Sequence, residues 1–430
     1  MPDSDHYILI SADAHAGADL RAYKPYLESK YHDDFEDWAA AMEENARLMR
    51  ETMKQLGMAR SVGVDGDPEA DADRNWNSER RLREQEADGW VAEVIFPNTQ
   101  PPFAPMARSQ LEAPGAGDDA EHRWAGLKAH NRWLADYVSL APERRAGCAQ
   151  VFLGDIEGSV QEIEWAAEQG LRGGIVLPGA PPGSGFLPLY AAEYEPMWAA
   201  CEATEMPVNH HSGGGTPDFG MHPPASTAMF MLEVTWWAHR PLWHLIFAGV
   251  FERHPNLQFC NTESGTRWIL DTLPELDSFY DRMKYGHGSE VFFGGAATRD
   301  LSLRPSEYWH RQCHIGASFI RPKEAELRYE VGIDRIMWGV DYPHNEGSQP
   351  YTRVHLRRAF SGVPPAEVEQ MVTLNAAKLY KFDLDALAPI AKRVCPTKAE
   401  VFEPYPWSDV PEDAKSCPGL HAENQKELVS

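Results

Sequence analysis

The sequence predicts an α/β fold of the (β/α)8 class, a distorted TIM barrel, and three observations support this prediction. Eight short apolar runs recur along the 430 residues, amphipathic stretches separate them, and polar side chains stand where several runs end. Strands that alternate with helices predict a parallel sheet, and eight such units predict a closed barrel. The runs, in chain order, are residues 7–15, 90–98, 147–153, 173–179, 206–211, 257–263, 313–318 and 335–341.

The stretches between the runs have the spacing of helices that cover a barrel. In residues 157–171, Val160, Ile163 and Ala167 recur near one face of a helix. Residues 230–255 are dense in tryptophan, and they could either wall an aromatic pocket or pack as a helix against the barrel. We expect the second of these.

Two regions exceed a minimal barrel. Residues 20–88 combine a charged helical pattern with an acidic, glycine-bearing stretch, which predicts a helical insertion or cap after the first strand. Residues 396–430 are polar and rich in proline, so we expect a C-terminal tail that either crosses a neighbouring subunit or is partly disordered. Residues 1–395 would then form the barrel with its insertion.

Charge and composition exclude several classes of partner. The formal net charge is -25, from 65 acidic and 40 basic residues, so nucleic acid and anionic membrane surfaces are poor partners. No apolar run reaches the ~18 to 20 residues that span a bilayer, and the first residues lack the pattern of a secretory leader. The six cysteines never form a CxxC pair, so we expect reduced thiols in a soluble, cytoplasmic protein.

Polar side chains capable of chemistry stand at the ends of four runs. In a (β/α)8 barrel the active site gathers where the strands end, so these positions are the first candidates. Asp13 and His15 lie two positions apart, which puts both side chains on the same side of a strand. The other candidates are His210 and His211 in the fifth run, Glu263 in the sixth and Asp341 in the eighth.

Asp13, His15, His211 and Asp341 together predict a catalytic metal site. Imidazole and carboxylate ligands suit Zn²⁺, and with an added water they also suit Mn²⁺ or Fe²⁺. Four protein ligands leave room for water or substrate, which is typical of catalytic sites. Asp-x-His alone would usually be a capping turn, so the prediction depends on the matching strand ends elsewhere in the chain. We expect one divalent ion, with Zn²⁺ as the first choice.

Motifs along most of the chain resemble the amidohydrolase superfamily, in the branch related to aminocarboxymuconate semialdehyde decarboxylase and the dihydroxybenzoate decarboxylases. The likeness rests on a series of segments rather than on one motif. They are "ISADAH", "RLREQEADGWVAEVIFPN", "NRWLADYVSLAPERRAG", "MPVNHHSGG", "GVFERHPNLQFCNTESG", "RIMWGVDYPHNEG" and "NAAKLYKFD".

The resemblance implies a divalent metal held by the first-strand pair, a fifth-strand histidine and an eighth-strand aspartate. The family pattern is similar to a histidine two residues before a glycine, which selects His211 rather than His210. His210 would then support the ligands or face the substrate, because neighbours on a strand point in opposite directions.

Two positions depart from the family pattern. Glu263 stands where the decarboxylases of this branch have a sixth-strand histidine that is thought to help proton transfer. Asp13 stands where many relatives have the first histidine of the opening motif. A glutamate can act as an acid or base if burial raises its pKa, or it can join the metal, so both roles stay open for Glu263.

Three further residues are candidate substrate contacts. Asn98 ends the second run, and His344 and Glu346 lie in the loop just after Asp341. Such a loop would cover the same end of the barrel, although a loop histidine can also be merely solvated.

These residues suggest an enzyme that acts on a small organic molecule. The leading hypothesis is a metal-dependent hydrolase in which metal-activated water attacks a carbonyl, Asp341 accepts the proton, and Glu263 or His344 assists the leaving group. The alternative is a metal-dependent decarboxylase in which a protonated residue delivers H⁺ to a ring carbon. A third hypothesis is a barrel without catalysis that acts as a binding protein. The tail and the family likeness also predict a homodimer or a higher oligomer.

Overall fold

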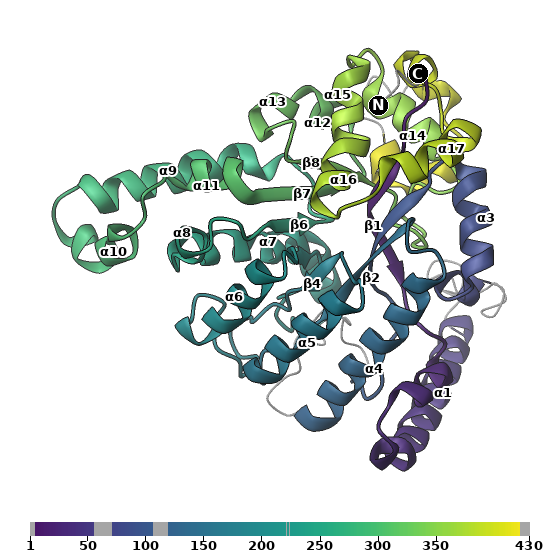
Figure 1. Cartoon of the computed structure of the whole chain (residues 1–430), viewed down its shortest axis with the longest axis horizontal. Coiled ribbons are helices and arrows are strands. Elements are labelled where there is room, and N and C mark those ends of the chain that lie inside the picture. Colours follow the sequence, from purple (N-terminus) through teal and green to yellow (C-terminus); the bar gives the residue numbers. More distant parts are fainter. Residues whose placement is uncertain (1–4, 56–70, 106–118, 221, 223, 422–430) are drawn as a thin grey trace.

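The computed structural model describes residues 5–55, 71–105, 119–220, 222 and 224–421. Eight parallel strands form one sheet in the order β1 to β8, each paired with the next along the chain (Figure 1). The predicted (β/α)8 architecture is therefore confirmed, and each strand falls within or next to a predicted run. The strands are Ile10–Ala16, Ala92–Pro97, Arg145–Gln150, Gly174–Val176, Val208–His211, Phe259–Thr262, Cys313–Ser318 and Ile336–Gly339.

The sheet closes between β1 and the residues that follow β8. The backbone N–H of Asp341 donates to the carbonyl of Asp13 at 2.9 Å, and that of His15 donates to Tyr342 at 2.6 Å. On its other side, β1 pairs with β2 through a register shift between Ser11 and Ala14. The barrel is therefore irregular at the level of Asp13, where the first and last strands meet.

Helices surround the strands and are fixed by local capping as well as by packing. Asp119, Asp155 and Asp383 accept hydrogen bonds from the first free N–H groups of α4, α5 and α17. All residues of the eight strands are buried, as a barrel covered by helices requires. The longer helices are α1 His32–Gln55, α3 Ser78–Asp88, α4 Ala120–Ser139, α5 Ile156–Glu168, α6 Glu195–Ala203, α7 Ala225–Phe247, α9 Trp268–Tyr285, α10 Ser289–Arg299, α11 Pro305–Gln312, α14 Thr352–Phe360 and α17 Leu384–Val394. The shorter ones are α8 Val250–Arg253, α12 Pro322–Glu326, α13 Arg328–Val331, α15 Pro365–Glu369, α16 Asn375–Leu379 and α18 Lys398–Phe402.

The segment between β1 and β2 contains two different kinds of helix. Helix α1 lies at the edge of the molecule and is mostly exposed (Figure 1), as a charged insertion would be. Helix α3 instead buries Arg81, Gln85 and Asp88 directly before β2, so it belongs to the layer that covers the barrel. Part of the acidic stretch, residues 64–70, lies outside the described residues.

The C-terminal segment folds back onto its own barrel as far as residue 421, whereas we expected a tail that either crosses a neighbouring subunit or is partly disordered; residues 422–430 lie outside the described residues. His6 and Thr397 form an antiparallel bridge that ties this segment to the start of the chain. The apolar side chains of the segment then form a small core against the loop after β7 and helix α14. This core consists of Val410, Ala414, Cys417 and Leu420, with Phe319, Tyr351, Val354, Tyr405 and Trp407 packed around it.

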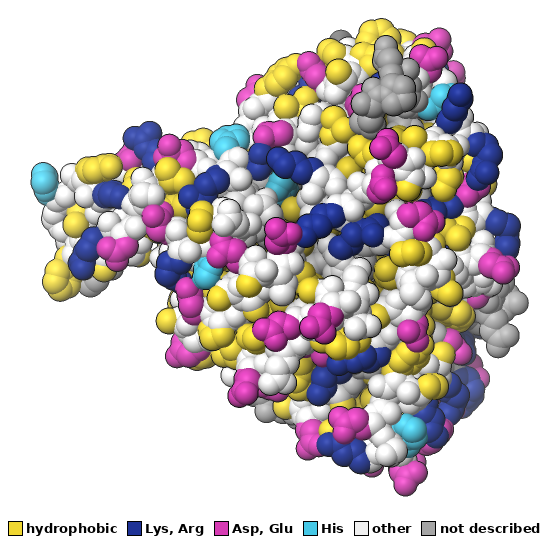
Figure 2. All heavy atoms as spheres, in the orientation of Figure 1, with side chains coloured by type: hydrophobic (Ala, Val, Ile, Leu, Met, Phe, Trp, Pro, Cys, Tyr) yellow, Lys and Arg dark blue, Asp and Glu magenta, His cyan; other side chains and the backbone are white. Residues whose placement is uncertain are grey.

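Helices α9 and α10 form an arm that extends away from the barrel (Figure 1). Acidic, basic and apolar side chains are mixed along the arm (Figure 2), so it is not a patch of one charge. The six cysteines all lie in described segments and are buried thiols without a disulfide, as predicted. In the described part of the chain, every helix is too short or too polar to cross a membrane.

Candidate metal centre

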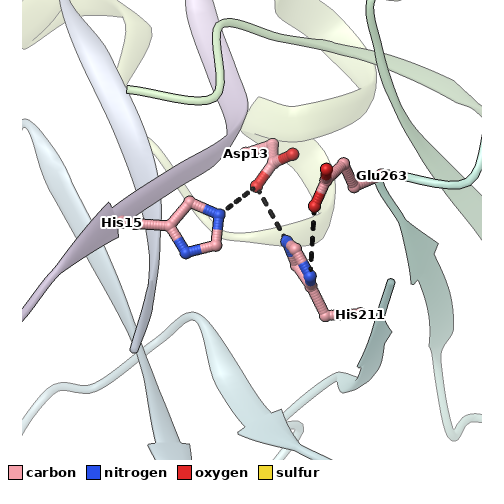
Figure 3. Close-up of side chains that lie close together, drawn as sticks. All are labelled: Asp13, His15, His211 and Glu263. Atoms are coloured by element: carbon pink, nitrogen blue, oxygen red, sulfur yellow. Dashed lines mark hydrogen bonds and ion pairs between the residues drawn. The ribbon is translucent and has the colours of Figure 1, made fainter. Parts of the chain in front are cut away.

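Four side chains converge inside the barrel, at the ends of three strands (Figure 3). Asp13 and His15 come from β1, His211 comes from the last position of β5, and Glu263 directly follows β6. Asp13 Oδ1 lies 3.3 Å from His15 Nε2 and 3.2 Å from His211 Nε2. Glu263 Oε2 lies 3.4 Å from the other ring nitrogen of His211, Nδ1. The i, i+2 spacing of Asp13 and His15 thus places both side chains in one site.

Asp341 and His344 lie on the other side of His15. Asp341 Oδ1 is 3.2 Å from His15 Nε2 and 2.8 Å from His344 Nδ1. The same His15 atom therefore belongs to both groups, and it links Asp13 and His211 in the first group to Asp341 in the second. Glu263 also belongs to the first group, although the sequence left open whether it binds the metal or acts as an acid or base.

Several buried polar atoms at this centre have no hydrogen-bond partner in the described part of the chain, and a bound cation would fill that place. Asp13 and Asp341 are 0% exposed, and His15 and His211 are 2% exposed. Oδ2 of Asp341 is buried without a hydrogen bond from any described residue, and Oδ1 of Asp341 and Nε2 of His15 face each other without forming a hydrogen bond. Two buried carboxylates beside each other are costly without a compensating charge, so the donor set fits a divalent cation.

The two histidines are oriented by backbone carbonyls. Nδ1 of His15 hydrogen-bonds to the carbonyl of Pro97 at 3.1 Å, and Nδ1 of His211 to that of Ser212 at 2.9 Å. Protonation at Nδ1 leaves Nε2 of each ring free to bind a metal, which is the usual arrangement of metal-binding histidines. Burial by itself would lower the pKa of His15, but the carboxylates of Asp13 and Asp341 raise it well above its usual range. The site thus favours a positive charge at this position.

Asp13 is held in place from the far side. The hydroxyl of Ser318, at the end of β7, donates a hydrogen bond to Asp13 Oδ2, so Oδ1 remains directed at His15 and His211. Asp13 and Ser318 can come this close only because residue 339 is glycine. A Cβ there would lie 2.7 Å from Asp13 Cβ and 2.9 Å from Ser318 Oγ. Burial favours a raised pKa for Asp13, but the two histidines hold that pKa well below its usual range. The carboxyl group is therefore ionised and available as a ligand.

Glu263 and Asp341 both have left-handed backbone conformations, with φ of 55° and 60°. Residues other than glycine rarely adopt this region, and such strain is concentrated at functional sites. In Glu263 the strain accompanies a side chain that turns back from the end of β6 toward His211 (Figure 3).

The side chain of Glu263 is 21% exposed, so it lies at the boundary between the metal centre and solvent. Burial raises its pKa well above the usual range, and the nearby charges of Asp341 and Asp13 raise it further. Both effects favour the protonated form of Glu263, and a protonated carboxyl group is the state required of a general acid.

The predicted substrate contacts occupy different positions. His344 is partly exposed, and its Nε2 lies 3.0 Å from Asn98 Oδ1, so these two residues form one group beside Asp341. Glu346 is exposed in the loop after β8. His210 is buried, its ring nitrogens face the carbonyls of Leu177 and Gly214, and it also lines a hollow with Arg240 and His244.

Two features of the site were not predicted. In the sequence, Ser318 is only the last residue of the seventh run, although a hydroxyl at the end of a strand was a usable signal. Arg81 Nη1 donates to the carbonyl of His15 at 2.7 Å, and its Nη2 pairs with Glu93 at 2.7 Å. Charged residues that are buried usually pair with each other, so an arginine in a helix and a glutamate inside an apolar strand were a usable signal. This pair fixes the backbone of His15, a candidate metal ligand.

Comparisons with known proteins bear on the family and the fold of this chain. A family model described as amidohydrolase matches residues 70–382. Among solved structures, 5-carboxyvanillate decarboxylase from Sphingomonas paucimobilis is 21% identical over 88% of this chain and 100% of its own, with a TM-score of 0.62. The 2,6-dihydroxybenzoate decarboxylase from Rhizobium is 15% identical over 88% of this chain and 99% of its own, with a TM-score of 0.57.

A third solved structure is a dihydroxybenzoic acid decarboxylase from a Polaromonas species with bound manganese and the inhibitor 2-nitroresorcinol. It is 15% identical over 87% of this chain and 97% of its own, with a TM-score of 0.56. At these identities the structural matches show a shared fold, whereas the family model covers most of the chain, including the positions of His211, Glu263 and Asp341. The chain belongs to the amidohydrolase family and is an enzyme of that superfamily.

Proposed function

We propose that this enzyme is a metal-dependent, non-oxidative decarboxylase of a small aromatic carboxylic acid, the second of the two reactions that the sequence suggested. The observation that carries the proposal is the place of Glu263, whose carboxyl group lies 3.4 Å from His211 at the boundary between the candidate metal centre and solvent, with a pKa that burial raises. Replacing a carboxylate on a ring by hydrogen requires an acid at the reacting carbon, and Glu263 can be that acid. The solved structures named above are decarboxylases of aromatic acids, which supports the same reaction.

The metal would be held by Asp13, His15, His211 and Asp341, whose oxygen and nitrogen donors suit Mn²⁺ as well as Zn²⁺. We place Mn²⁺ first, because manganese is bound in the dihydroxybenzoic acid decarboxylase of similar fold. When bound, the ion supplies positive charge that holds an aromatic carboxylate and a neighbouring hydroxyl and withdraws electrons from them.

Glu263 performs the proton transfer in this proposal. Its carboxyl group donates H⁺ to the ring carbon that carries the carboxylate, and that carbon becomes tetrahedral. The bond between the ring and the carboxyl carbon then breaks, its electron pair restores the aromatic ring, and CO₂ leaves. Glu263 is left as a carboxylate, and its 21% exposed side chain regains a proton from solvent.

His344 and Asn98 position the substrate from the opposite side. Nδ1 of His344 is 2.8 Å from Asp341, and its Nε2 is 3.0 Å from Asn98, so the ring has a fixed orientation. The ring is partly exposed and packs 4.2 Å from the ring of His15, centroid to centroid. A substrate hydroxyl next to the metal could therefore hydrogen-bond to this group, while Glu346 would contact only a larger substrate.

Hydrolysis remains the second candidate, on a different observation. Oδ2 of Asp341 has no hydrogen bond from a described residue, so Asp341 could accept a proton from an attacking water. Hydrolysis uses Asp341 as a base, whereas decarboxylation uses Glu263 as an acid, and this difference can be measured.

The test is to incubate the manganese-loaded enzyme with 2,6-dihydroxybenzoate and 5-carboxyvanillate that carry ¹³C in the carboxyl group next to a ring hydroxyl. Decarboxylation predicts release of ¹³CO₂ and, in D₂O, one deuterium on the ring carbon that lost it. A panel of aryl esters, lactones and anilides is the matched comparison. Hydrolysis of that panel with no ¹³CO₂ from any carboxylated ring would overturn the proposal. We also propose a small-molecule substrate, a cytoplasmic location and, from the family likeness, a homo-oligomeric assembly.

A further inference from the structure

The C-terminal segment packs directly against the residue that follows Ser318. We call residues 404–421 the C-terminal clasp, and they lie beyond the part of the chain that the family model matches. Leu420 of the clasp is 0% exposed, and Phe319 packs against the small core to which Leu420 belongs. The backbones also meet, because a Cβ at Gly419 would lie 3.1 Å from the carbonyl carbon of Phe319. The clasp therefore contacts the main chain one residue after Ser318.

Phe319 has a backbone conformation that its surroundings must hold. Its φ is 62°, in the left-handed region, which a residue with a side chain adopts only at a cost and keeps only where its neighbours enforce it. The next residue is fixed by His355, whose Nε2–H donates to the carbonyl of Ile320 at 2.9 Å. A Cβ at Gly419 would lie 2.6 Å from the same His355 atom, so glycine allows the clasp to pack over this hydrogen bond. Phe319 is thus held between the end of β7 and the clasp.

The position of Phe319 matters because Ser318 supports a candidate metal ligand. Ser318 is the last residue of β7, and its hydroxyl donates to Asp13 Oδ2. Ser318 and Phe319 share a peptide bond, so a shift of Phe319 also moves Ser318. Since a hydrogen bond weakens when its length or angle departs from the ideal, even a small shift would loosen the contact with Asp13.

Polar contacts anchor the clasp to α14 and to the residue before that helix. The hydroxyl of Tyr351 donates to the carboxylate of Asp413. Arg357 Nη2 donates to the carbonyl of Pro404 at 3.1 Å, and the guanidinium carbon of Arg357 lies 4.8 Å from the ring centroid of Tyr405. These contacts lie away from Phe319, so the clasp has a fixed place from which it can hold that residue.

We infer that the C-terminal clasp is a positioning element of the metal centre. Gly419 and Leu420 hold Phe319 in its left-handed conformation. Phe319 in turn keeps the hydroxyl of Ser318 on Asp13. The inference rests on the metal centre proposed above, but it does not depend on whether that centre performs decarboxylation or hydrolysis.

Competition between the full-length protein and a fluorescent chelator for Mn²⁺ tests the inference. Gly419→Ala places a Cβ against Phe319 and His355 and should weaken Mn²⁺ binding about 10-fold, the effect expected when a contact that supports a ligand is loosened. Leu420→Ala loosens the same core and should act in the same direction. Glu412→Ala changes a side chain of the clasp that is 89% exposed, so this control should bind Mn²⁺ like the wild type.

A double-mutant cycle with Ser318→Ala separates positioning from a general loss of stability. If the clasp acts through Ser318, Gly419→Ala should weaken Mn²⁺ binding by less than about twofold once that hydroxyl is absent. A general loss of stability would instead weaken binding by the same factor with and without the hydroxyl. Circular dichroism and urea unfolding of the metal-free variants show whether each one is folded.

Two results would overturn the inference alone. The first is tight Mn²⁺ binding by the wild type with unchanged affinity in G419A and L420A. The second is a G419A effect that is equally large in the wild-type and S318A backgrounds. A wild type that binds no Mn²⁺ would contradict the metal centre itself and the inference with it, so the two failures can be told apart.

Discussion

Nε2 of His15 lies 3.2 Å from Oδ1 of Asp341, across the junction where the first strand of the barrel meets the segment after the last. The two residues are joined there by backbone hydrogen bonds between Asp13 and Asp341 and between His15 and Tyr342. Closing the barrel therefore also brings the residues of the candidate metal centre together. A chain that cannot close its barrel cannot bring these ligands together.

Replacing Asp341 by asparagine should abolish metal binding while the barrel stays folded. The change keeps the shape of the side chain but removes a negative charge that His15 and the cation share. We expect the metal content to fall from about one ion per chain to near zero. Elemental analysis after gel filtration measures it, with Asp300→Asn at the exposed end of α10 as the control. Full metal content in D341N would mean that Asp341 is not a ligand.

Replacing Glu263 by glutamine should stop catalysis without removing the metal. Glutamine cannot donate the proton, so kcat should fall by about 10² to 10⁴. Glu263→His restores a group that can carry a proton and should recover part of the loss. Metal content measured on the same samples separates the two roles that the sequence left open. Loss of the ion in E263Q would make Glu263 a ligand rather than the acid.

Removing the hydroxyl of Ser318 should weaken metal binding, although Ser318 is not itself a proposed ligand. Asp13 Oδ2 would lose its hydrogen-bond donor, and such supporting contacts are usually worth about 10 to 100-fold in metal affinity. Competition with a fluorescent chelator gives the dissociation constant for Ser318→Ala. Ser318→Thr keeps the hydroxyl and should bind more tightly than S318A. Equal affinities for the wild type and S318A would show that this hydrogen bond does not position Asp13.

The sequence predicted those parts of the site that lie on strands or directly after them. Asp13 and His15 could be paired from their spacing and Asp341 from its place at the end of an apolar run, whereas the choice of His211 over His210 came from the resemblance to the family. The turn of Glu263 toward His211 depends on a left-handed backbone, which no local pattern in "CNTESG" specifies. The role of Ser318 depends on the absence of a side chain at Gly339, on a different strand. Such relationships come from the closed barrel rather than from any one segment.

The same distinction holds for the fold. Eight strands could be read from apolar runs because burial on both faces leaves a continuous hydrophobic signal. The docking of the C-terminal segment could not, since Val410, Ala414, Cys417 and Leu420 are spread among polar and proline residues. Their partners, such as Phe319 and Tyr351, come from parts of the chain about 60 to 100 residues earlier.

Buried histidines should make the protein sensitive to acid. Burial lowers the pKa of His355 to about 4 and that of His314 to about 3, so both stay neutral in the folded state. The unfolded chain takes up protons at these residues below its ordinary pKa of 6.5, and stability is therefore lost as the pH falls below 6.5. At pH 5.5 the loss is about 1.4 kcal/mol for each such histidine.

Urea unfolding of metal-free protein at pH 7.5 and 5.5 measures this dependence. His355→Gln should reduce the difference in stability between the two pH values, whereas His287→Gln, at an exposed position, should leave it unchanged. An undiminished pH dependence in H355Q would show that His355 takes up a proton as readily folded as unfolded.

The location of the metal is the most direct measurement. Crystals grown with Mn²⁺ should show one anomalous peak inside the barrel, within about 2.0 to 2.3 Å of ligand atoms from Asp13, His15, His211 and Asp341. Glu263 should lie outside bonding distance, with its carboxyl group directed at the space beside the ion. The absence of a peak, or a peak bound by Glu263 and His344 but not by Asp13 and His211, would contradict the proposed centre.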